Sequence, residues 1–369
     1  MAGGVSLGLG LTSLQQADGP AGIGERVGQP TLSRVWATST TQRENRRTRD
    51  NDHMPGSDLP LVDDRLAWKS QNEPAELDTL TPLGSWGGPI IVSMPRTGST
   101  LLATLFLLLH DQDGKHVFER YIHEPVAPIF WEGKPIESVL EVADGRLTVG
   151  DIVQESAYQF TSKEIAHWFL HRARKPIAFV MRHPQLTWPS RWRIMLREWL
   201  AEDPDSPNAG RFHDALDGND FSDLGDILTT RVTQPDNGWY SFMSLVNRCR
   251  EEDIEFVIVD NGQFRSDPDR VLAQMCQSWG HDFDDAMTTW DDLSEAIPRI
   301  VMSDLAAGPE YAWYYAQTLG STGGIIHTDK EPVPLDRFPN VLRGESEDHL
   351  TIDTAVEWYQ MLLALPETI

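Results

Sequence analysis

The sequence has little cysteine, no long apolar run and few basic residues relative to acidic ones. Its two cysteines, Cys249 and Cys276, are too few for a disulfide scaffold or a four-cysteine zinc site. The longest apolar run, residues 101–109 with one threonine, is too short to cross a bilayer. With 31 basic against 56 acidic residues, the net charge of −25 argues against a nucleic-acid binder and against a polyanionic acceptor.

The charge and the apolar residues are unevenly distributed along the 369 residues. The first 55 residues hold six arginines, five acidic residues and one aromatic, Trp36, so they cannot bury enough apolar area to offset the entropy of ordering. We therefore expect a disordered leader over residues 1–59, with Met54 as an alternative start, and one folded domain over 60–369. The leader lacks the pattern of a secretory signal, so we expect a cytoplasmic protein.

The rest of the chain alternates short apolar runs with helical patterns. Three runs are apolar almost throughout, as in strands that are buried on both faces: residues 89–94, 177–181 and 255–259. Helical patterns follow them over 99–110, 185–200 and 267–279, the last with a stop at Gly280, and a final helix is expected over 352–363. The sequence predicts an α/β fold with a parallel sheet covered by helices on both faces.

The first predicted strand runs into Pro-Arg-Thr-Gly-Ser-Thr at residues 95–100 and then into a helix. A strand, a tight glycine turn and a helix N-terminus together form an anion site, because backbone N–H groups converge there. The nucleoside triphosphate version needs lysine directly after the second glycine. Here Ser99 follows Gly98, which disfavours a Walker-type ATPase. The alternative is an ordinary turn in which Ser99 or Thr97 only caps the helix.

The motif PRTGSTLL after a buried strand resembles the 5′-phosphosulfate loop of the sulfotransferases that use PAPS (3′-phosphoadenosine 5′-phosphosulfate). The resemblance implies the P-loop, three-layer sulfotransferase fold. It also implies that Arg96 contacts the bridging phosphate–sulfate region of the donor. The residues implied to hold the 5′-phosphate are Thr97, Gly98, Ser99 and Thr100.

A second stretch is basic within an otherwise acidic chain. Residues 172–197 contain seven basic residues and no acidic one: Arg172, Arg174, Lys175, Arg182, Arg191, Arg193 and Arg197. In an open α/β sheet, ligands bind beyond the carboxyl ends of the strands, where Arg182 falls, and a helix after it could bring Ser190 close. An arginine at a strand end with a serine eight residues later is similar to the family's 3′-phosphate site. The alternative is a set of solvated surface cations.

Two further positions compare less closely with the family. Arg343-Gly344 before the last helix is similar to the family's late Arg-Lys-Gly loop without its lysine, which implies a third contact to the 3′-phosphate. Many members carry an adenine-stacking aromatic where Leu101 stands, so no adenine-stacking residue is assigned.

Sulfuryl transfer needs a base for the acceptor and cations for the leaving phosphate. Glu124-Pro125 resembles the Glu-Pro element of carbohydrate-type sulfotransferases, whose glutamate is a proposed base. His123, His167 and His171 are alternative bases, and Glu124 could instead be structural. His167 and His171 share a helical face but belong to no HExxH pattern, so we expect no metal site.

These observations predict an enzyme that moves a sulfuryl group from PAPS, which leaves as PAP, to a hydroxyl or amine of a small-molecule acceptor. The implied catalytic residues are Glu124, Arg96 and His123. No nucleic acid, membrane or metal partner is expected. Two other functions stay open: an ATP-dependent P-loop phosphotransferase and a non-catalytic nucleotide-binding module.

Overall fold

The computed structural model describes residues 59–62, 67, 87–133, 147–160, 162–230, 236–290, 293, 295–302, 324–325, 331–344, 346 and 349–369. By its internal contacts the chain divides into Met1–Asp52 and His53–Ile369, and every described residue belongs to the second unit. The leader expected over residues 1–59 therefore lies, apart from Leu59, outside the described residues.

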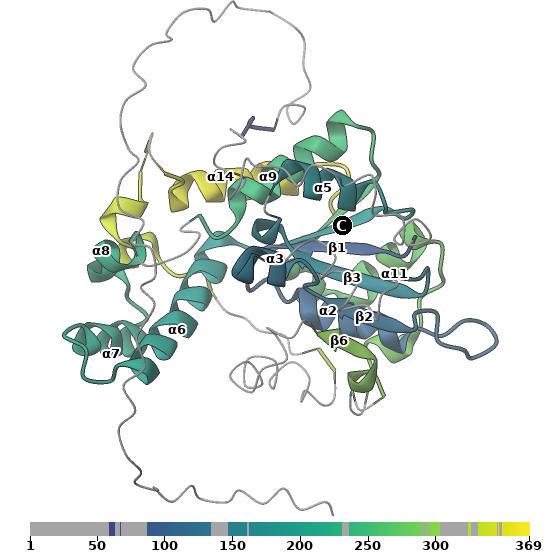
Figure 1. Ribbon diagram of the computed structural model, residues 1–369, viewed down its shortest axis with the longest axis horizontal. Helices are drawn as coiled ribbons and strands as arrows, with labels where there is room; N and C mark the ends of the chain where they lie inside the picture. Colours follow the sequence, from purple (N-terminus) through teal and green to yellow (C-terminus); the bar gives the residue numbers. More distant parts are fainter. Residues whose placement is uncertain are drawn as a thin grey trace, which may run out of the picture. The chain divides into compact units, whose positions relative to one another are not determined.

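Six strands form one parallel sheet in the order β5-β4-β1-β3-β2-β6. Figure 1 labels β1, β3, β2 and β6 of this sheet. In chain order the six strands are β1 (Ile90–Ser93), β2 (Arg120–His123), β3 (Asp151–Ser156), β4 (Ile177–Met181), β5 (Phe256–Asp260) and β6 (Ile300–Met302). Strands β1, β4 and β5 correspond to the three apolar runs. Strands β2, β3 and β6 were not predicted, because β2 and β3 contain charged and amide residues and β6 is only three residues long.

Alternate residues of the strands enter two separate hydrophobic cores, one on each face of the sheet. Phe179 of β4, for example, lies in one core and Val180 in the other. The first core is covered by α5 (Lys163–Leu170), α6 (Pro184–Glu202), α7 (Ala209–Gly218), α8 (Gly225–Leu228), α9 (Trp239–Glu251) and α14 (Ile352–Leu363). The second is covered by α2 (Ser99–Leu105), η3 (Phe106–Leu108), α10 (Asn261–Ser266) and α11 (Pro268–Trp279). The three-layer α/β fold predicted from the sequence is confirmed.

The helices predicted over 99–110, 185–200, 267–279 and 352–363 correspond to α2 with η3, α6, α11 and α14, with bounds that agree to within a few residues. Gly280 ends α11 with a φ of 78°, a left-handed conformation that glycine adopts without steric cost. Within the described residues, none of the helices combines the length and the apolar character that a membrane span requires.

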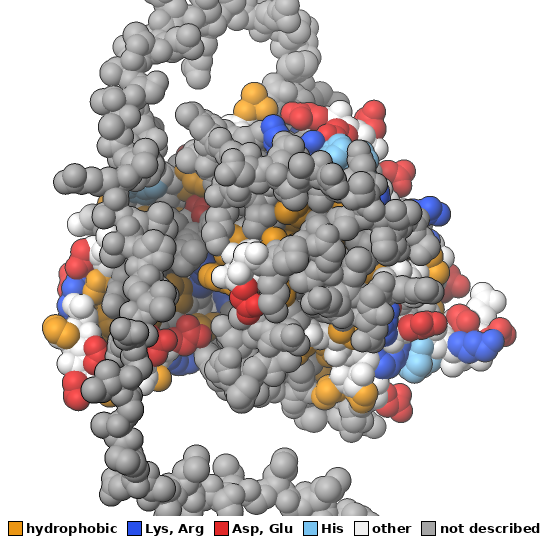
Figure 2. All heavy atoms as spheres, viewed as in Figure 1, with side chains coloured by type: hydrophobic (Ala, Val, Ile, Leu, Met, Phe, Trp, Pro, Cys, Tyr) orange, Lys and Arg blue, Asp and Glu red, His pale blue; other side chains and the backbone are white. Residues whose placement is uncertain are grey.

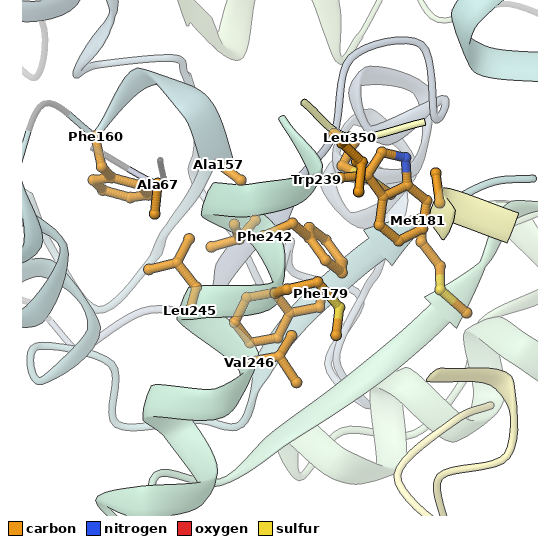
Figure 3. Close-up of a cluster of buried hydrophobic side chains, with 14 of the residues drawn as sticks. Ala67, Ala157, Phe160, Phe179, Met181, Trp239, Phe242, Leu245, Val246 and Leu350 are labelled. Atoms are coloured by element: carbon orange, nitrogen blue, oxygen red, sulfur yellow. The ribbon is translucent and has the colours of Figure 1, made fainter. Parts of the chain in front are cut away.

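Aromatic side chains fill the space between the sheet and α9 (Figure 3). The rings of Phe179 in β4 and Phe242 in α9 lie 5.4 Å apart at 80°, an edge-to-face contact. Trp188 and Trp192 of α6 are buried in the same core. Complete burial of one such side chain contributes about 1.5–3 kcal/mol, so this core fixes α6 and α9 against the sheet.

The connections around β1 and β4 create the crevice that positions the site. The chain leaves β1 through α2 on one face and travels towards β2, whereas it leaves β4 through α6 on the other face and travels towards β5. Strands β1 and β4 are neighbours, so the chain diverges at their carboxyl ends. Ligands of open α/β sheets bind at such a topological switch point.

Candidate functional site

The loop after β1 is a tight turn built on two left-handed residues. Arg96 has a φ of 67° and Gly98 a φ of 82°, and the Thr97 hydroxyl donates to the Met94 carbonyl over 2.9 Å. A Cβ atom at Gly98 would lie 2.8 Å from Nδ2 of Asn261, so a side chain there is excluded. No described side chain caps α2 at its first turn, which argues against the alternative that Ser99 or Thr97 is only a helix cap.

Three residues predicted from separate motifs meet beside this loop. The Arg96 Nε donates to the Ser190 hydroxyl over 3.3 Å, although the two residues are 94 positions apart. The Arg182 guanidinium donates to the Arg96 carbonyl over 3.4 Å. The loop, the end of β4 and the first turns of α6 therefore form one cluster.

A further arginine, Arg265 of α10, belongs to the same cluster and was missed in the sequence. Its Nε donates to Oδ1 of Asn261 over 3.0 Å, and its Nη2 lies 3.8 Å from the Cβ position of Gly98. Burial, together with repulsion from Arg265 and Arg96 and against the attraction of Asp260, lowers the pKa of Arg182 to about 10. Three cations thus converge on one place, where an anion would relieve their repulsion.

Asn261 presents a hydrogen-bond donor to the same place. Its side chain is buried, and among the described residues its Nδ2 has no hydrogen-bond partner. That atom lies against Gly98, 2.8 Å from the position that a Cβ atom would take, so its approach to the loop depends on the glycine. A phosphate oxygen fits this donor and these cations. Asn261 directly follows a buried strand, and this position was the signal in the sequence that could have identified it.

The remaining basic residues of 172–197 do not join the cluster as a group. Arg193 donates to Asn219, Arg197 is exposed, and Arg191 donates to Asn237 over 3.2 Å. The other three, Arg172, Arg174 and Lys175, precede β4 and so lie at the amino edge of the sheet, opposite the loop. The single positive region expected from composition is therefore divided between two edges, because β4 runs through the middle of the stretch.

Two other sequence assignments stand apart from the cluster. Arg343 directly follows η9 (Asn340–Leu342), and no hydrogen bond between described residues joins it to Arg182 or Ser190. Its Nε is buried without a partner among those residues. A 3′-phosphate contact by Arg343 stays a prediction. Leu101, which stands at the family's adenine-stacking position, packs against the second core.

Carboxylates gather on the other side of the loop, at the ends of β2 and β3. Glu124 follows β2 with a φ of 47°, a conformation that non-glycine residues rarely adopt. Its two carboxylate oxygens accept hydrogen bonds from the Ser156 hydroxyl over 2.7 Å and from the Gln159 amide over 3.0 Å. These bonds hold a half-buried carboxylate in one orientation at the edge of the sheet.

Glu155, a second acid that the sequence did not single out, lies beneath this turn. It is fully buried, and its carboxylate accepts from the backbone N–H groups of Val126 and Ser156 over 2.7 and 2.8 Å. Burial raises the pKa of Glu155 well above its usual range, and the nearby Glu124 carboxylate raises it further. Glu155 therefore ties together the two segments that hold Glu124.

Of the three histidines considered as bases, His123 directly precedes Glu124 at the end of β2, whereas the other two lie at the opposite edge of the sheet. His123 is buried, with its Nδ1 2.5 Å from the Tyr121 hydroxyl and 2.7 Å from Oε1 of Gln154, and burial lowers its pKa. His167 and His171 lie at the end of α5, just before β4 begins, and so at the opposite edge of the sheet from the loop. Of the candidate bases, Glu124 is the one placed beside the loop with partial exposure.

The charged groups of the site are arranged in order along the carboxyl edge of the sheet. In the strand order, α10 and Arg182 follow β5 and β4, the loop follows β1, and Ser156 and Glu124 follow β3 and β2. Strands are about 4.8 Å apart, so Glu124 and the loop are separated by two strand spacings, about 10 Å. Arg182 and Arg265 lie on one side of the loop together with the buried carboxylate of Asp260, and Glu124 and Glu155 lie on the other side.

No protein-family model matches the chain, and no curated protein matches it. Three solved structures that it is similar to are sulfotransferases. Mouse sulfotransferase SULT7A1 complexed with PAP has 12% identity and a TM-score of 0.34, over 78% of this chain and 89% of that chain. The sulfotransferase domain of the Synechococcus PCC 7002 olefin synthase has 15% identity and a TM-score of 0.31, over 76% of this chain and 97% of that chain. The sulfotransferase domain from the curacin biosynthetic pathway has 14% identity and a TM-score of 0.29, over 76% of this chain and 93% of that chain.

Proposed function

We propose that this protein transfers a sulfuryl group from PAPS to a hydroxyl or amine of a small-molecule acceptor. One observation carries the proposal: Arg96, Arg182 and Ser190, predicted from two separate motifs, are joined by hydrogen bonds at the switch point of the sheet. A glutamate held by two hydrogen bonds lies on the other side of the same loop.

The chain's own residues fit the two phosphates of the donor, which supplies an activated sulfuryl group when bound. Arg182 and Ser190 bind the 3′-phosphate, and the backbone N–H groups of residues 97–100 bind the 5′-phosphate. Arg265 and Asn261 approach the loop at Gly98 and add a cation and an amide donor. Arg96 lies between these groups, since it contacts both Ser190 and Arg182.

The acceptor enters from the side of β3 and β2. Its oxygen or nitrogen forms a bond to sulfur while the bond between sulfur and the bridging phosphate oxygen breaks, and that oxygen keeps the electron pair. Glu124 takes the acceptor's proton, with Ser156 and Gln159 fixing the direction of its carboxylate. Arg96 stabilises the charge that develops on the leaving phosphate.

An ATP-dependent phosphotransferase has less support from the same residues. Such enzymes hold Mg²⁺ with a carboxylate near the loop. Asp260 at the end of β5 is the acid placed most like that ligand. Its oxygens already accept from the Tyr359 hydroxyl over 2.9 Å and from the Gln263 N–H over 3.0 Å.

A thermal-shift comparison tests the proposal. The melting temperature is measured without ligand, with PAP and with ATP plus Mg²⁺, for the parent, Arg182→Ala and Arg193→Ala. We expect PAP to raise the melting temperature of the parent and of Arg193→Ala, since Arg193 contacts Asn219 away from the loop, but much less that of Arg182→Ala. Stabilisation by ATP plus Mg²⁺ alone would identify a phosphotransferase.

Turnover needs a second measurement, because a nucleotide-binding module without activity would also bind PAP. Candidate alcohols, phenols and amines are incubated with PAPS and the parent protein, and mass spectrometry detects a gain of one sulfuryl group. Sulfation by the parent and not by Glu124→Gln supports the enzyme. PAP binding without sulfation of any candidate supports the non-catalytic module.

A further inference from the structure

A second cluster of titratable side chains lies at the amino edge of the sheet. His167 and His171 are one helical turn apart at the end of α5, and Glu252 directly follows α9. The helices α5 and α9 precede the paired strands β4 and β5, so their ends meet opposite the edge that carries the phosphate loop. This cluster takes no part in the proposed transfer.

The two imidazoles meet the same carboxylate oxygen. Oε2 of Glu252 lies 2.7 Å from Nε2 of His171 and 3.1 Å from Nδ1 of His167, and the two rings are 4.1 Å apart. A tetrahedral Zn²⁺ with bonds of about 2.0–2.2 Å separates its ligand atoms by about 3.3 Å. The present distances are close to that value, and the possible ligand atoms all lie within 4.8 Å of one another.

We propose that His167, His171 and Glu252 bind a divalent transition-metal ion such as Zn²⁺. Two imidazoles and one carboxylate are a ligand set that Zn²⁺ commonly takes, with water in the fourth position. The side chains of His167 and His171 are 44% and 40% exposed, which leaves the open side for that water. The ion would join the end of α5 to the end of α9 and so stabilise the fold.

Arg248 of α9 is the neighbour that opposes the ion. Its Nη2 lies 3.0 Å from Nδ1 of His167, the same nitrogen that faces Oε2 of Glu252. The Arg248 Nε lies 3.0 Å from Oε1 of Glu252, the other oxygen, so Arg248 has only to leave His167 when the ion binds.

The charge of the chain favours a cation at such a site. Acidic side chains are spread over the described surface seen in Figure 2, and the net charge is −25. The sequence could not indicate the site, because the third ligand lies 81 residues after His171.

Isothermal titration of the full chain with Zn²⁺, after dialysis against a chelator, tests the proposal. We expect one Zn²⁺ per chain and a higher melting temperature. His171→Ala and Glu252→Gln should each weaken binding at least about tenfold, because each removes a ligand. His213→Ala, which removes an exposed histidine of α7, is the matched control and should bind as the parent does.

Arg248→Gln separates the site from a simple ion-pair network. Removal of the competing cation should tighten Zn²⁺ binding by about tenfold, a change of about 1.4 kcal/mol. Three results would overturn the proposal: no Zn²⁺ binding by the parent, equal binding by the parent and His171→Ala, or binding by Arg248→Gln alone. Far-ultraviolet circular dichroism confirms that each variant is folded. The outcome is independent of PAP binding, because the two sites lie at opposite edges of the sheet.

Discussion

The two sides of the loop after β1 differ in their charged groups: Arg182 and Arg265 surround one acid, Asp260, towards β4 and β5, whereas Glu124 and Glu155 lie towards β3 and β2. Towards β4 and β5, arginines repel one another, and this repulsion adds to burial in lowering the pKa of Arg182. Towards β3 and β2, Glu155 and Glu124 are also close, but hydrogen bonds from Val126, Ser156 and Gln159 satisfy their oxygens. The acidic side is completed by the chain itself, whereas the basic side gains most from a bound anion.

The strongest test of this difference is Glu124→Gln. The substitution keeps the shape of the side chain but removes its basicity, so we expect a loss of about 10²–10⁴-fold in kcat. PAP affinity should stay unchanged, because Glu124 lies on the side of the loop away from Arg182. Steady-state sulfation and PAP titration measure the two effects. A variant with parental kcat would exclude Glu124 as the base.

Arg96 lies between the two sides, and Arg96→Ala should affect both. We expect kcat to fall by about 10²–10³-fold, as when one electrostatic donor to a transition state is removed. PAP affinity should fall less, because Arg182, Arg265 and Ser190 remain. Equal losses in kcat and in PAP affinity would instead assign Arg96 to ground-state binding.

The basic side alone is tested by PAP titration of Arg182→Ala, Arg265→Ala and Ser190→Ala. A hydrogen bond to a charged group contributes about 1.5–3 kcal/mol, so each arginine should cost about 10–100-fold in affinity. Ser190 should cost less than tenfold, since its hydroxyl is neutral. Arg193→Ala, on the same helix as Ser190, is the control. Parental affinity in Arg182→Ala would remove the 3′-phosphate assignment.

The acidic side alone should show the smallest effect, as a pH dependence of stability. The pKa of Glu155 is raised in the folded protein, so between its ordinary and raised values the folded state holds a proton that the unfolded state releases. The free energy of unfolding should therefore fall as the pH rises through this window, by at most about 1.4 kcal/mol per pH unit.

Urea unfolding of the parent and of Glu155→Gln over a series of pH values measures this slope. The variant should lack the contribution, and Glu357→Gln, which changes an exposed glutamate of α14, should keep it. Identical slopes in the parent and in Glu155→Gln would contradict the buried-acid interpretation.

The parts of the fold that could be predicted are those in which local sequence and burial agree. Strands β1, β4 and β5 are apolar on both faces, and α11 begins at a proline and ends at a glycine. Strand β3 could not be predicted from Asp-Ile-Val-Gln-Glu-Ser, because its polar residues are satisfied by partners distant in the sequence. Asp151, for instance, is buried and accepts two hydrogen bonds of 2.9 Å from Arg120 of β2.

The residues of the site also divide into those indicated by local sequence and those that depend on distant parts of the chain. Arg96, Arg182 and Ser190 could be predicted, because each belongs to a short motif at a strand end. Arg265 and Glu155 belong to no motif, and only the three-dimensional structure brings Arg265 to Gly98 and Glu155 beneath Glu124. Their positions depend on which strands are neighbours, a property of the whole sheet.

Strand β3 also determines which positions of this protein tolerate substitution. All six of its residues are buried. Ile152 and Val153 pack in the two cores, while Glu155 and Ser156 support Glu124, so a substitution here affects both the folding of the sheet and the position of the proposed base. Under the proposed function, variants with a new acceptor preference are therefore better sought at Trp131, which is 43% exposed and packs near Tyr158. A library that randomises Trp131 and Tyr158 and leaves β3 intact would show whether acceptor preference can change without a loss of stability.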